Sequence, residues 1–186
     1  MHPDLARLIE GFRSPMGARD PLGRSLEDLR ARMSSLASPG WVVHFDALLD
    51  ALFTTFTWEA IHRSNGVGPD LDTYRRMREV SVGLHPEFAL AELAFACELT
   101  PAERAHPTLR RMASSAALSV GWANDLFTCA REQRDGEVHN LVLVLMAREG
   151  ATLSEATRRA ASMHDAEVAT FVALERELGR EGHRPA

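Results

Sequence analysis

Lysine is absent from this sequence of 186 residues, and all 21 of its basic residues are arginines. The 26 acidic residues outnumber them, so the formal net charge is −5, and we expect no basic surface of the kind that binds nucleic acid. Only two cysteines are present, Cys97 and Cys129, and their separation fits neither a disulfide framework nor a metal motif. This scarcity favours a reducing, cytoplasmic setting.

Long apolar runs are also missing from the sequence. No segment approaches the roughly 20 apolar residues that a membrane-spanning helix needs, and the N-terminus lacks a signal-peptide pattern. Strand-like alternation, internal repeats and low-complexity segments are not found either. With 45% hydrophobic and 25% charged residues, the composition is that of a globular protein, and residues 1–186 are long enough for a single domain.

Helical periodicity recurs along the whole chain. Helices are predicted where apolar residues return every three or four positions and where Pro, Gly or an N-cap residue marks an end. Residues 41–64 are long and largely apolar, so this helix is expected to be central and well buried. A capping box is expected at Thr100, and Ser154 is expected to cap the last helix. The sequence predicts an all-α bundle with helices at residues 4–12, 22–36, 41–64, 70–80, 86–99, 107–134, 136–148 and 154–178.

Three oxygen-bearing side chains recur at four-residue intervals within the predicted helix 107–134. At about 100° per residue, Asn124, Thr128 and Glu132 fall on one face. Amide, hydroxyl and carboxylate oxygens are hard ligands that Mg²⁺ or Mn²⁺ accepts, with substrate phosphates completing the coordination. Arg131 points toward the same side, and a cation beside a metal site implies that an anion binds there too. The spacing predicts a site for a divalent metal and an anion.

The same face continues upstream through Ala113, Ala117, Val120 and Gly121. A small apolar stripe below a metal site would form the body of a pocket. Small residues on a helix face also permit close helix packing in ordinary cores. The stripe alone leaves both interpretations open.

Two polar residues beside the candidate ligands are expected to support the site. Asp125 lies about 100° from the ligand face, so a hydrogen-bonding role is favoured over direct metal binding. Asn140 precedes an apolar segment and is expected to cap or anchor the next helix.

The residues from Asn124 to Glu132 are similar to the metal-binding triad of class I terpene synthases, in which Asn, Ser or Thr, and Glu bind one Mg²⁺. Residues 132–142 resemble the stretch that follows this triad in bacterial members. The resemblance continues upstream through Trp58-Glu59-Ala60, Arg63, Pro69 and Tyr74-x-x-x-Arg78. Because separated motifs agree over nearly the whole chain, the sequence resembles the central portion of a bacterial class I terpene synthase.

This resemblance implies a reaction, a cofactor and roles for individual residues. The reaction is the Mg²⁺-dependent ionisation and cyclisation of a prenyl diphosphate, of farnesyl or geranyl type, with release of diphosphate. Arg78 matches the diphosphate-sensing arginine, and Arg131 matches a second diphosphate-binding cation. Ser81 matches the linker residue and Val82 the effector residue whose carbonyl faces the developing cation.

Two features of the family are missing from the sequence. The aspartate-rich motif that binds the other metals is absent, and the similarity of residues 20–24 puts its expected place just before Met1. The C-terminal Arg-Tyr pair is absent as well, since Tyr74 is the only tyrosine. The resemblance therefore implies a class I bundle truncated at both ends, with half of a diphosphate clamp. Apolar faces left open by truncation would favour self-association, of which a homodimer is the simplest form.

Three functional interpretations are open on these observations. The chain is part of a prenyl diphosphate cyclase, a noncatalytic protein that retains a half-site for metal and diphosphate, or a helical scaffold with a relic motif. Arg78 and Arg131 also have structural interpretations as members of surface ion pairs. The aromatic residues are candidate walls for a carbocation or ordinary core residues, and Trp122 is assigned to the core: Phe53, Phe56, Trp58 and Trp122.

Overall fold

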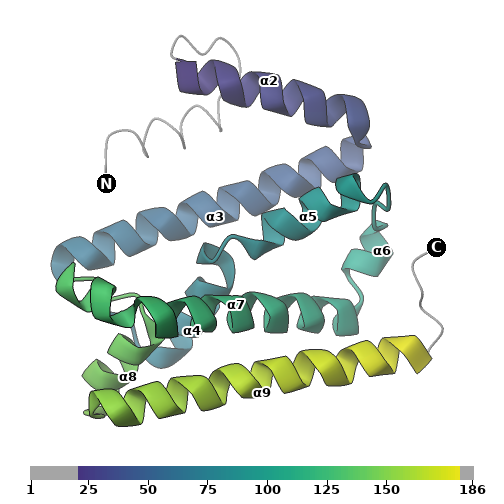
Figure 1. Cartoon of the computed structure of the whole chain (residues 1–186). Coiled ribbons are helices and arrows are strands. Elements are labelled where there is room, and N and C mark those ends of the chain that lie inside the picture. Colours follow the sequence, from purple (N-terminus) through teal and green to yellow (C-terminus); the bar gives the residue numbers. More distant parts are fainter. Residues whose placement is uncertain (1–20, 181–186) are drawn as a thin grey trace.

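The computed structural model describes residues 21–180, and the regular elements in this range are helices (Figure 1). The all-α prediction is confirmed. The helix expected at residues 4–12 lies outside the described residues. None of the helices between residues 21 and 180 has both the length and the apolar character that a membrane span requires. The helices are α2 (Pro21–Leu36), α3 (Pro39–Asn65), α4 (Leu71–Ser81), α5 (Leu84–Ala94), α6 (Pro101–Arg104), α7 (Pro107–Arg134), α8 (Leu141–Glu149) and α9 (Leu153–Arg180).

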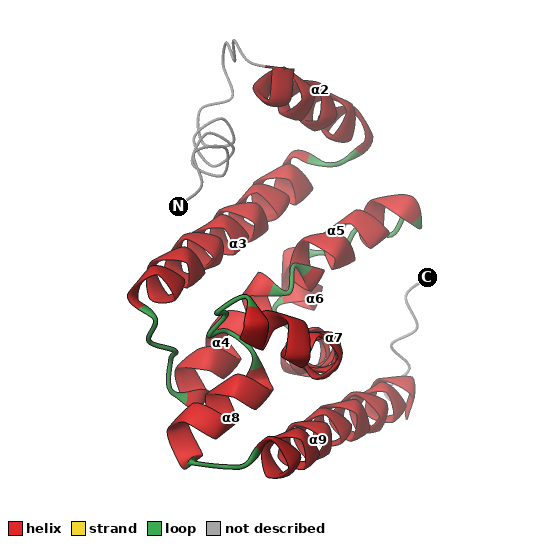
Figure 2. Ribbon diagram, turned by 60° about the vertical axis from the view of Figure 1, so that its left-hand side comes forward, coloured by secondary structure: helices red, strands yellow, loops and turns green. Residues whose placement is uncertain are grey.

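Helix α7 is the element against which most of the others pack. It runs alongside α9 over much of its length in Figure 1, and Figure 2 shows it nearly end-on beside α4 and α8. The larger core fills the space between these four helices, and burial of its large side chains stabilises their packing by about 1.5 to 3 kcal/mol each. Its buried members include Tyr74, Leu118, Trp122, Leu141, Val142, Val144, Leu145, Ala156 and Ala160.

Helix α3 does not have the central position that its apolar sequence predicts. It packs against α5 through Trp41 and Phe45, and the Trp41 indole Nε1 donates a hydrogen bond to the Ala89 carbonyl at 3.1 Å. Val43 and Ile61 on the same helix are exposed. The expectation of a well-buried central helix at 41–64 is therefore wrong for this helix within the described residues, because its apolar residues are spread around the axis instead of facing one partner.

Two helices are shorter than their sequence patterns predict. Helix α5 ends at Ala94, five residues early, because Ala96 has a φ of 51° and the Glu92 carboxylate accepts a hydrogen bond from the Leu99 N–H at 3.1 Å. Helix α8 begins at Leu141, five residues late. Gly136 has a φ of 73°, a conformation that glycine adopts readily, and the loop it opens continues to the N-cap of α8.

The predicted N-terminal cap is confirmed at α6 and is wrong at α9. The capping box between Thr100 and Glu103 is present in both directions. At α9 the capping residue is Thr152 instead of Ser154. Its hydroxyl accepts from the Glu155 N–H at 3.3 Å, and the Glu155 carboxylate accepts from the Thr152 N–H at 2.9 Å.

Candidate metal centre

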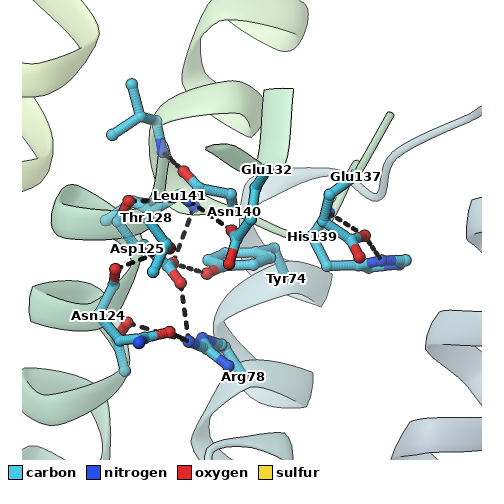
Figure 3. Close-up of polar contacts among 12 residues, drawn as sticks. Tyr74, Arg78, Asn124, Asp125, Thr128, Glu132, Glu137, His139, Asn140 and Leu141 are labelled. Carbon is cyan, nitrogen blue, oxygen red and sulfur yellow. Dashed lines mark hydrogen bonds and ion pairs between the residues drawn. The ribbon is translucent and has the colours of Figure 1, made fainter. Parts of the chain in front are cut away.

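The three predicted metal ligands follow one another along the C-terminal half of α7 (Figure 3). Asn124 is exposed, and Thr128 and Glu132 are half-buried. The Thr128 hydroxyl donates to the Asn124 carbonyl one turn earlier at 2.8 Å, which leaves its oxygen lone pairs free to accept. Their placement on one helix is as expected, and their metal-binding role stays a prediction.

The donor set of this triad suits a hard divalent cation. Among residues 21–180, no group of three or more His, Cys, Asp or Glu side chains could hold a metal. A metal at the triad would therefore be bound by one amide, one hydroxyl and one carboxylate oxygen, which are ligands of the Mg²⁺ type. The single carboxylate of the triad neutralises only half of the 2+ charge of such a metal. The remaining positive charge would favour binding of an anion to the metal.

Arg78 extends from α4 to the first residue of the triad. Its Nη2 donates to the Asn124 Oδ1 at 2.9 Å and to the Gly121 carbonyl at 3.2 Å, and it forms an ion pair with Asp125 at 2.8 Å. A Cβ on Gly121 would lie 3.3 Å from both Cγ and Nε of Arg78, so glycine permits this close approach. The side chain of Arg78 is only 14% exposed. The surface ion-pair interpretation is therefore wrong for this residue, since its partner is buried.

Asp125 is the centre of a buried hydrogen-bond network. Its carboxylate accepts from the Tyr74 hydroxyl and, at 2.9 Å, from the Leu141 N–H at the start of α8. It also forms the ion pair with Arg78, so one side chain joins α4, α7 and α8. The expected hydrogen-bonding role of Asp125 is confirmed. The contact with Tyr74 could not be predicted from the sequence, because it joins residues 51 positions apart.

The electrostatics of this network keep its members in defined protonation states. Burial raises the pKa of the Asp125 carboxyl above its usual value, although the Arg78 guanidinium and the Tyr74 hydroxyl act in the opposite direction. Burial lowers the pKa of Arg78, but the nearby Asp125, Tyr74 and Glu59 together outweigh this effect, and the net shift of the pKa is upward. Burial and the same carboxylate raise the pKa of Tyr74 well above its usual range. Tyr74 therefore remains a neutral donor and Arg78 remains a cation.

The helix break between α4 and α5 places Ser81 and Val82 against α7. Val82 caps α4, with its N–H bonded to the Arg78 carbonyl at 3.1 Å, and Gly83 follows with a φ of 82°. A Cβ on Gly121 would lie 3.6 Å from the Val82 Cβ, about one turn upstream of Asn124. Ser81 is buried, and its hydroxyl has no hydrogen-bond partner among the residues that the structure describes. The linker and effector roles stay predictions.

Arg131 lies at the outer end of the site. Its side chain is 64% exposed, and its Nη2 is 3.7 Å from the Glu132 Oε1. The ion pair of Arg131 in the structure is with Glu132, a member of the triad. A long, solvated arginine at this position is free to reach toward an anion bound at the triad.

The small residues upstream of Asn124 serve mainly as packing positions. Ala117 is fully buried, Gly121 lies beneath Arg78, and Val120 is exposed. Only Ala113 lines a cavity, of about 660 Å³, between α3, α5 and the N-terminal half of α7, and none of the triad residues line it. The helix-packing interpretation therefore holds for Ala117 and Gly121.

The candidate aromatic residues make packing contacts in the structure, and the role of Phe53, Phe56 and Trp58 toward a carbocation stays a prediction. Trp122 is in the larger core, with the Arg75 guanidinium 5.8 Å from its ring centroid. Trp58 packs against His62 and His139, at centroid distances of 4.1 and 5.0 Å. The core assignment of Trp122 is confirmed.

Comparison with known proteins assigns the family to which this site belongs. Residues 4–170 match the family model described as terpene synthase family 2, C-terminal metal binding. The chain belongs to the terpene synthase family. Membership of this metal-binding family implies the use of a divalent metal, and the resemblance seen in the sequence is confirmed.

Relatives of this terpene synthase chain include curated bacterial synthases. It is 33% identical over 172 residues to (+)-T-muurolol synthase ((2E,6E)-farnesyl diphosphate cyclizing) of Roseiflexus castenholzii, which covers 92% of this chain and 52% of the relative. It is 32% identical over 154 residues to germacrene A synthase of Nostoc punctiforme, with coverage of 83% and 48%. The chain thus spans about half the length of these curated relatives.

Solved structures of terpene synthases have the same fold. Hedycaryol synthase in complex with HEPES matches with a TM-score of 0.80 and 27% identity, over 98% of this chain and 59% of that chain. A variant of cucumene synthase matches with a TM-score of 0.80 and 26% identity, over 94% of this chain and 60% of that chain. The predicted class I bundle is confirmed as the fold.

Glu137 anchors the loop that connects the triad helix to α8. Its carboxylate accepts from the Arg63 Nε on α3 at 2.7 Å, from the His139 ring at 2.8 Å and from the Val138 N–H at 2.8 Å. Burial raises the pKa of Glu137, but these hydrogen bonds outweigh it and hold the pKa at about 2. The folded state therefore favours the ionised carboxylate, and the loop depends on that charge.

We expect a pH-dependent loss of stability that Glu137→Gln removes. The folded pKa lies below the unfolded one, so the stabilisation is present above about pH 4.5 and is lost as the pH falls toward 2. Between pH 5 and pH 3 the unaltered chain should lose about 1 to 2 kcal/mol more than the variant. Urea unfolding at both pH values measures this, with exposed Asp135→Asn in the same loop as the control. Equal losses in the unaltered chain and in Glu137→Gln would contradict the assignment.

Proposed function

We propose that this chain supplies one half of a prenyl diphosphate clamp. In this half, Asn124, Thr128 and Glu132 bind a divalent metal, Mg²⁺ or alternatively Mn²⁺, and Arg78 and Arg131 bind the diphosphate. The observation that carries the proposal is the convergence of a buried guanidinium and an array of hard oxygen ligands, with the Arg78 Nη2 only 2.9 Å from the Asn124 Oδ1. Cations and metal ligands gather at one point when an anion is the shared partner.

The substrate class follows from the relatives and from the chemistry of the site. The name of the Roseiflexus relative specifies farnesyl diphosphate as what it cyclises, so a farnesyl-type substrate is proposed, with geranyl diphosphate as a shorter alternative. Ionisation breaks the bond between C1 and the bridging oxygen, and the electron pair leaves with the diphosphate. A bound divalent metal would supply Lewis-acid stabilisation of that leaving group.

The residues of this chain would act on the diphosphate and on the developing cation. Arg78 is held as a cation by Asp125, so it is ready to bind diphosphate oxygens without reorganisation of its own charge. Arg131 is exposed and would reach the same anion from the outer side. Val82, at the helix break beside Gly121, would direct its backbone toward the cation, and Ser81 would shape that break.

The site in these 186 residues lacks the family's second set of carboxylates. The sequence has no aspartate-rich motif and, with one tyrosine, no C-terminal Arg-Tyr pair. A second candidate function is a noncatalytic protein that binds metal and diphosphate at the half-site. Both functions predict diphosphate binding, and only the first predicts products when the rest of the clamp is present.

The setting and assembly of the chain are proposed on separate observations. Cys97 and Cys129 are free thiols, which supports a reducing cytoplasm. Phe95 and Phe127 are exposed, at 79% and 91%, and such apolar surface supports self-association as a homodimer.

Calorimetric titration of the 186-residue chain with inorganic diphosphate tests the half-site. We expect binding that requires Mg²⁺ and that weakens at least tenfold in Asn124→Ala and in Glu132→Ala, because each change removes one metal ligand. Gln133→Ala, an exposed neighbour on the same helix, is the matched control and should bind like the unaltered chain. Binding that is independent of Mg²⁺, or equal in all four proteins, would show that the triad is not a metal site.

Incubation with farnesyl or geranyl diphosphate and Mg²⁺, followed by gas chromatography, separates binding from turnover. We expect little or no terpene product from the 186-residue chain, since a single metal site leaves most of the leaving-group charge unbalanced. Detection of cyclic products at rates typical of enzymes would show that these residues suffice for ionisation.

A further inference from the structure

Asn140 joins the start of α8 to the last ligand of the triad (Figure 3). Its Nδ2 donates to the Glu132 Oε2 at 2.9 Å and to the Asp125 backbone carbonyl at 2.8 Å. Its Oδ1 accepts from the Val142 N–H at 2.9 Å and, more weakly, from the Leu143 N–H at 3.5 Å. The side chain is fully buried, and both N–H donors and the oxygen acceptor are engaged.

Because the amide of Asn140 is planar and held in place, it also orients the Glu132 carboxylate. The Oδ1 of Asn140 is held by the first turn of α8, and one of its N–H bonds is held by the α7 carbonyl of Asp125. The remaining N–H donates to the Glu132 carboxylate, whose Oε2 lies 2.9 Å from the Asn140 Nδ2. A glutamate on a helix surface otherwise samples several rotamers, so this contact removes freedom before any metal arrives.

We propose that Asn140 is a positioning residue that holds one oxygen of the Glu132 carboxylate so that the other is presented to the metal. The inference rests on the proposed metal site at Asn124, Thr128 and Glu132. The second oxygen, Oε1, faces Arg131 at 3.7 Å and carries no hydrogen bond from Asn140. A carboxylate held at one oxygen and open at the other is prepared for monodentate coordination.

Capping of α8 alone does not account for an asparagine at residue 140. Ser, Thr and Asp also accept hydrogen bonds from the first turn of a helix and are comparable N-caps. Among these residue types, only asparagine combines that acceptor with an amide that donates two hydrogen bonds. The feature that distinguishes Asn140 from the other caps is therefore the donor side, which contacts Asp125 and Glu132.

The test removes the amide donor of Asn140 and keeps an oxygen that can cap α8. Asn140→Ser and Asn140→Thr retain a capping oxygen, and the β-branched threonine suits the extended backbone of residue 140, where φ is −140° and ψ is 132°. In the full chain, inorganic diphosphate binding is measured across a Mg²⁺ titration. We expect each variant to raise the Mg²⁺ concentration at half-saturation about tenfold, which is about 1.4 kcal/mol.

Repeating the Asn140 variants in a chain that carries Glu132→Asp distinguishes a positioning role of Asn140 from a role in folding. Glu132→Asp keeps a carboxylate but is one methylene too short to reach Asn140, so the same Asn140 variants should shift its Mg²⁺ midpoint less than twofold. A purely structural role would lower the number of binding sites per chain and act equally in both backgrounds. Equal factors in the two backgrounds, or an unchanged midpoint in the original one, would overturn the positioning role. Absence of Mg²⁺-dependent binding in the unaltered chain would instead overturn the proposed metal site itself.

Discussion

Asp125→Asn is expected to lower the free energy of unfolding by about 3 to 5 kcal/mol. The carboxylate is fully buried, and it is the counter-ion of Arg78, an acceptor for the Tyr74 hydroxyl and an acceptor for the Leu141 N–H. An amide of the same shape can still accept from one of these groups, but it leaves the largely buried guanidinium without a negative partner. The loss is large because the charge that remains stays desolvated.

Urea denaturation at pH 7 measures this loss, and two further variants make the reason testable. Asp135→Asn changes an exposed aspartate near the end of the same helix and should alter stability by no more than about 0.5 kcal/mol. Combining Asp125→Asn with Arg78→Gln removes both charges, so the double variant should be more stable than the sum of the single losses by about 1 to 3 kcal/mol. Strict additivity would show that the two side chains do not act as a pair.

Glu167→Gln is expected to lower the free energy of unfolding by about 2 to 4 kcal/mol, through contacts that do not include the triad residues. The Glu167 carboxylate on α9 accepts from the Arg75 Nη2 on α4 at 2.5 Å and pairs with the Arg111 Nη2 on α7 at 2.8 Å. Its side chain is only 7% exposed. Without the negative charge, the guanidinium groups from α4 and α7 lose the counter-ion that α9 supplies to both of them. The interface between α7 and α9 is the most extensive among the described helices.

The matched control for Glu167 is Glu175→Gln, two turns further along α9, where the side chain is exposed. We expect this variant to unfold within about 0.5 kcal/mol of the unaltered chain. High salt should weaken the difference between the two variants only slightly, because the Glu167 carboxylate is buried and poorly screened. Equal stability of the two variants would show that water solvates Arg75 and Arg111 well enough for the charge of Glu167 to add no stability.

The helices with strong local signals were predicted closely from the sequence. Residues 107–134 were predicted as one helix, and α7 has those bounds. The capping box at Thr100 and the cap at Asn140 were also predicted, because each depends on contacts within three residues along the chain. The cap of α9 was misplaced by two residues, since Thr152 and Ser154 both precede a helical pattern and only the contact with Glu155 decides between them.

The helical class, the bounds of α7 and the alignment of Asn124, Thr128 and Glu132 along it can all be read from the sequence. These follow from a period of 3.6 residues and need no partner. The contacts of Asp125 with Arg78 and Leu141, and of Asn140 with Glu132, follow from the tertiary structure alone. The partial burial of α3 is also a result of the tertiary packing. Such contacts join helices that loops bring together, so their geometry depends on packing that no local pattern encodes.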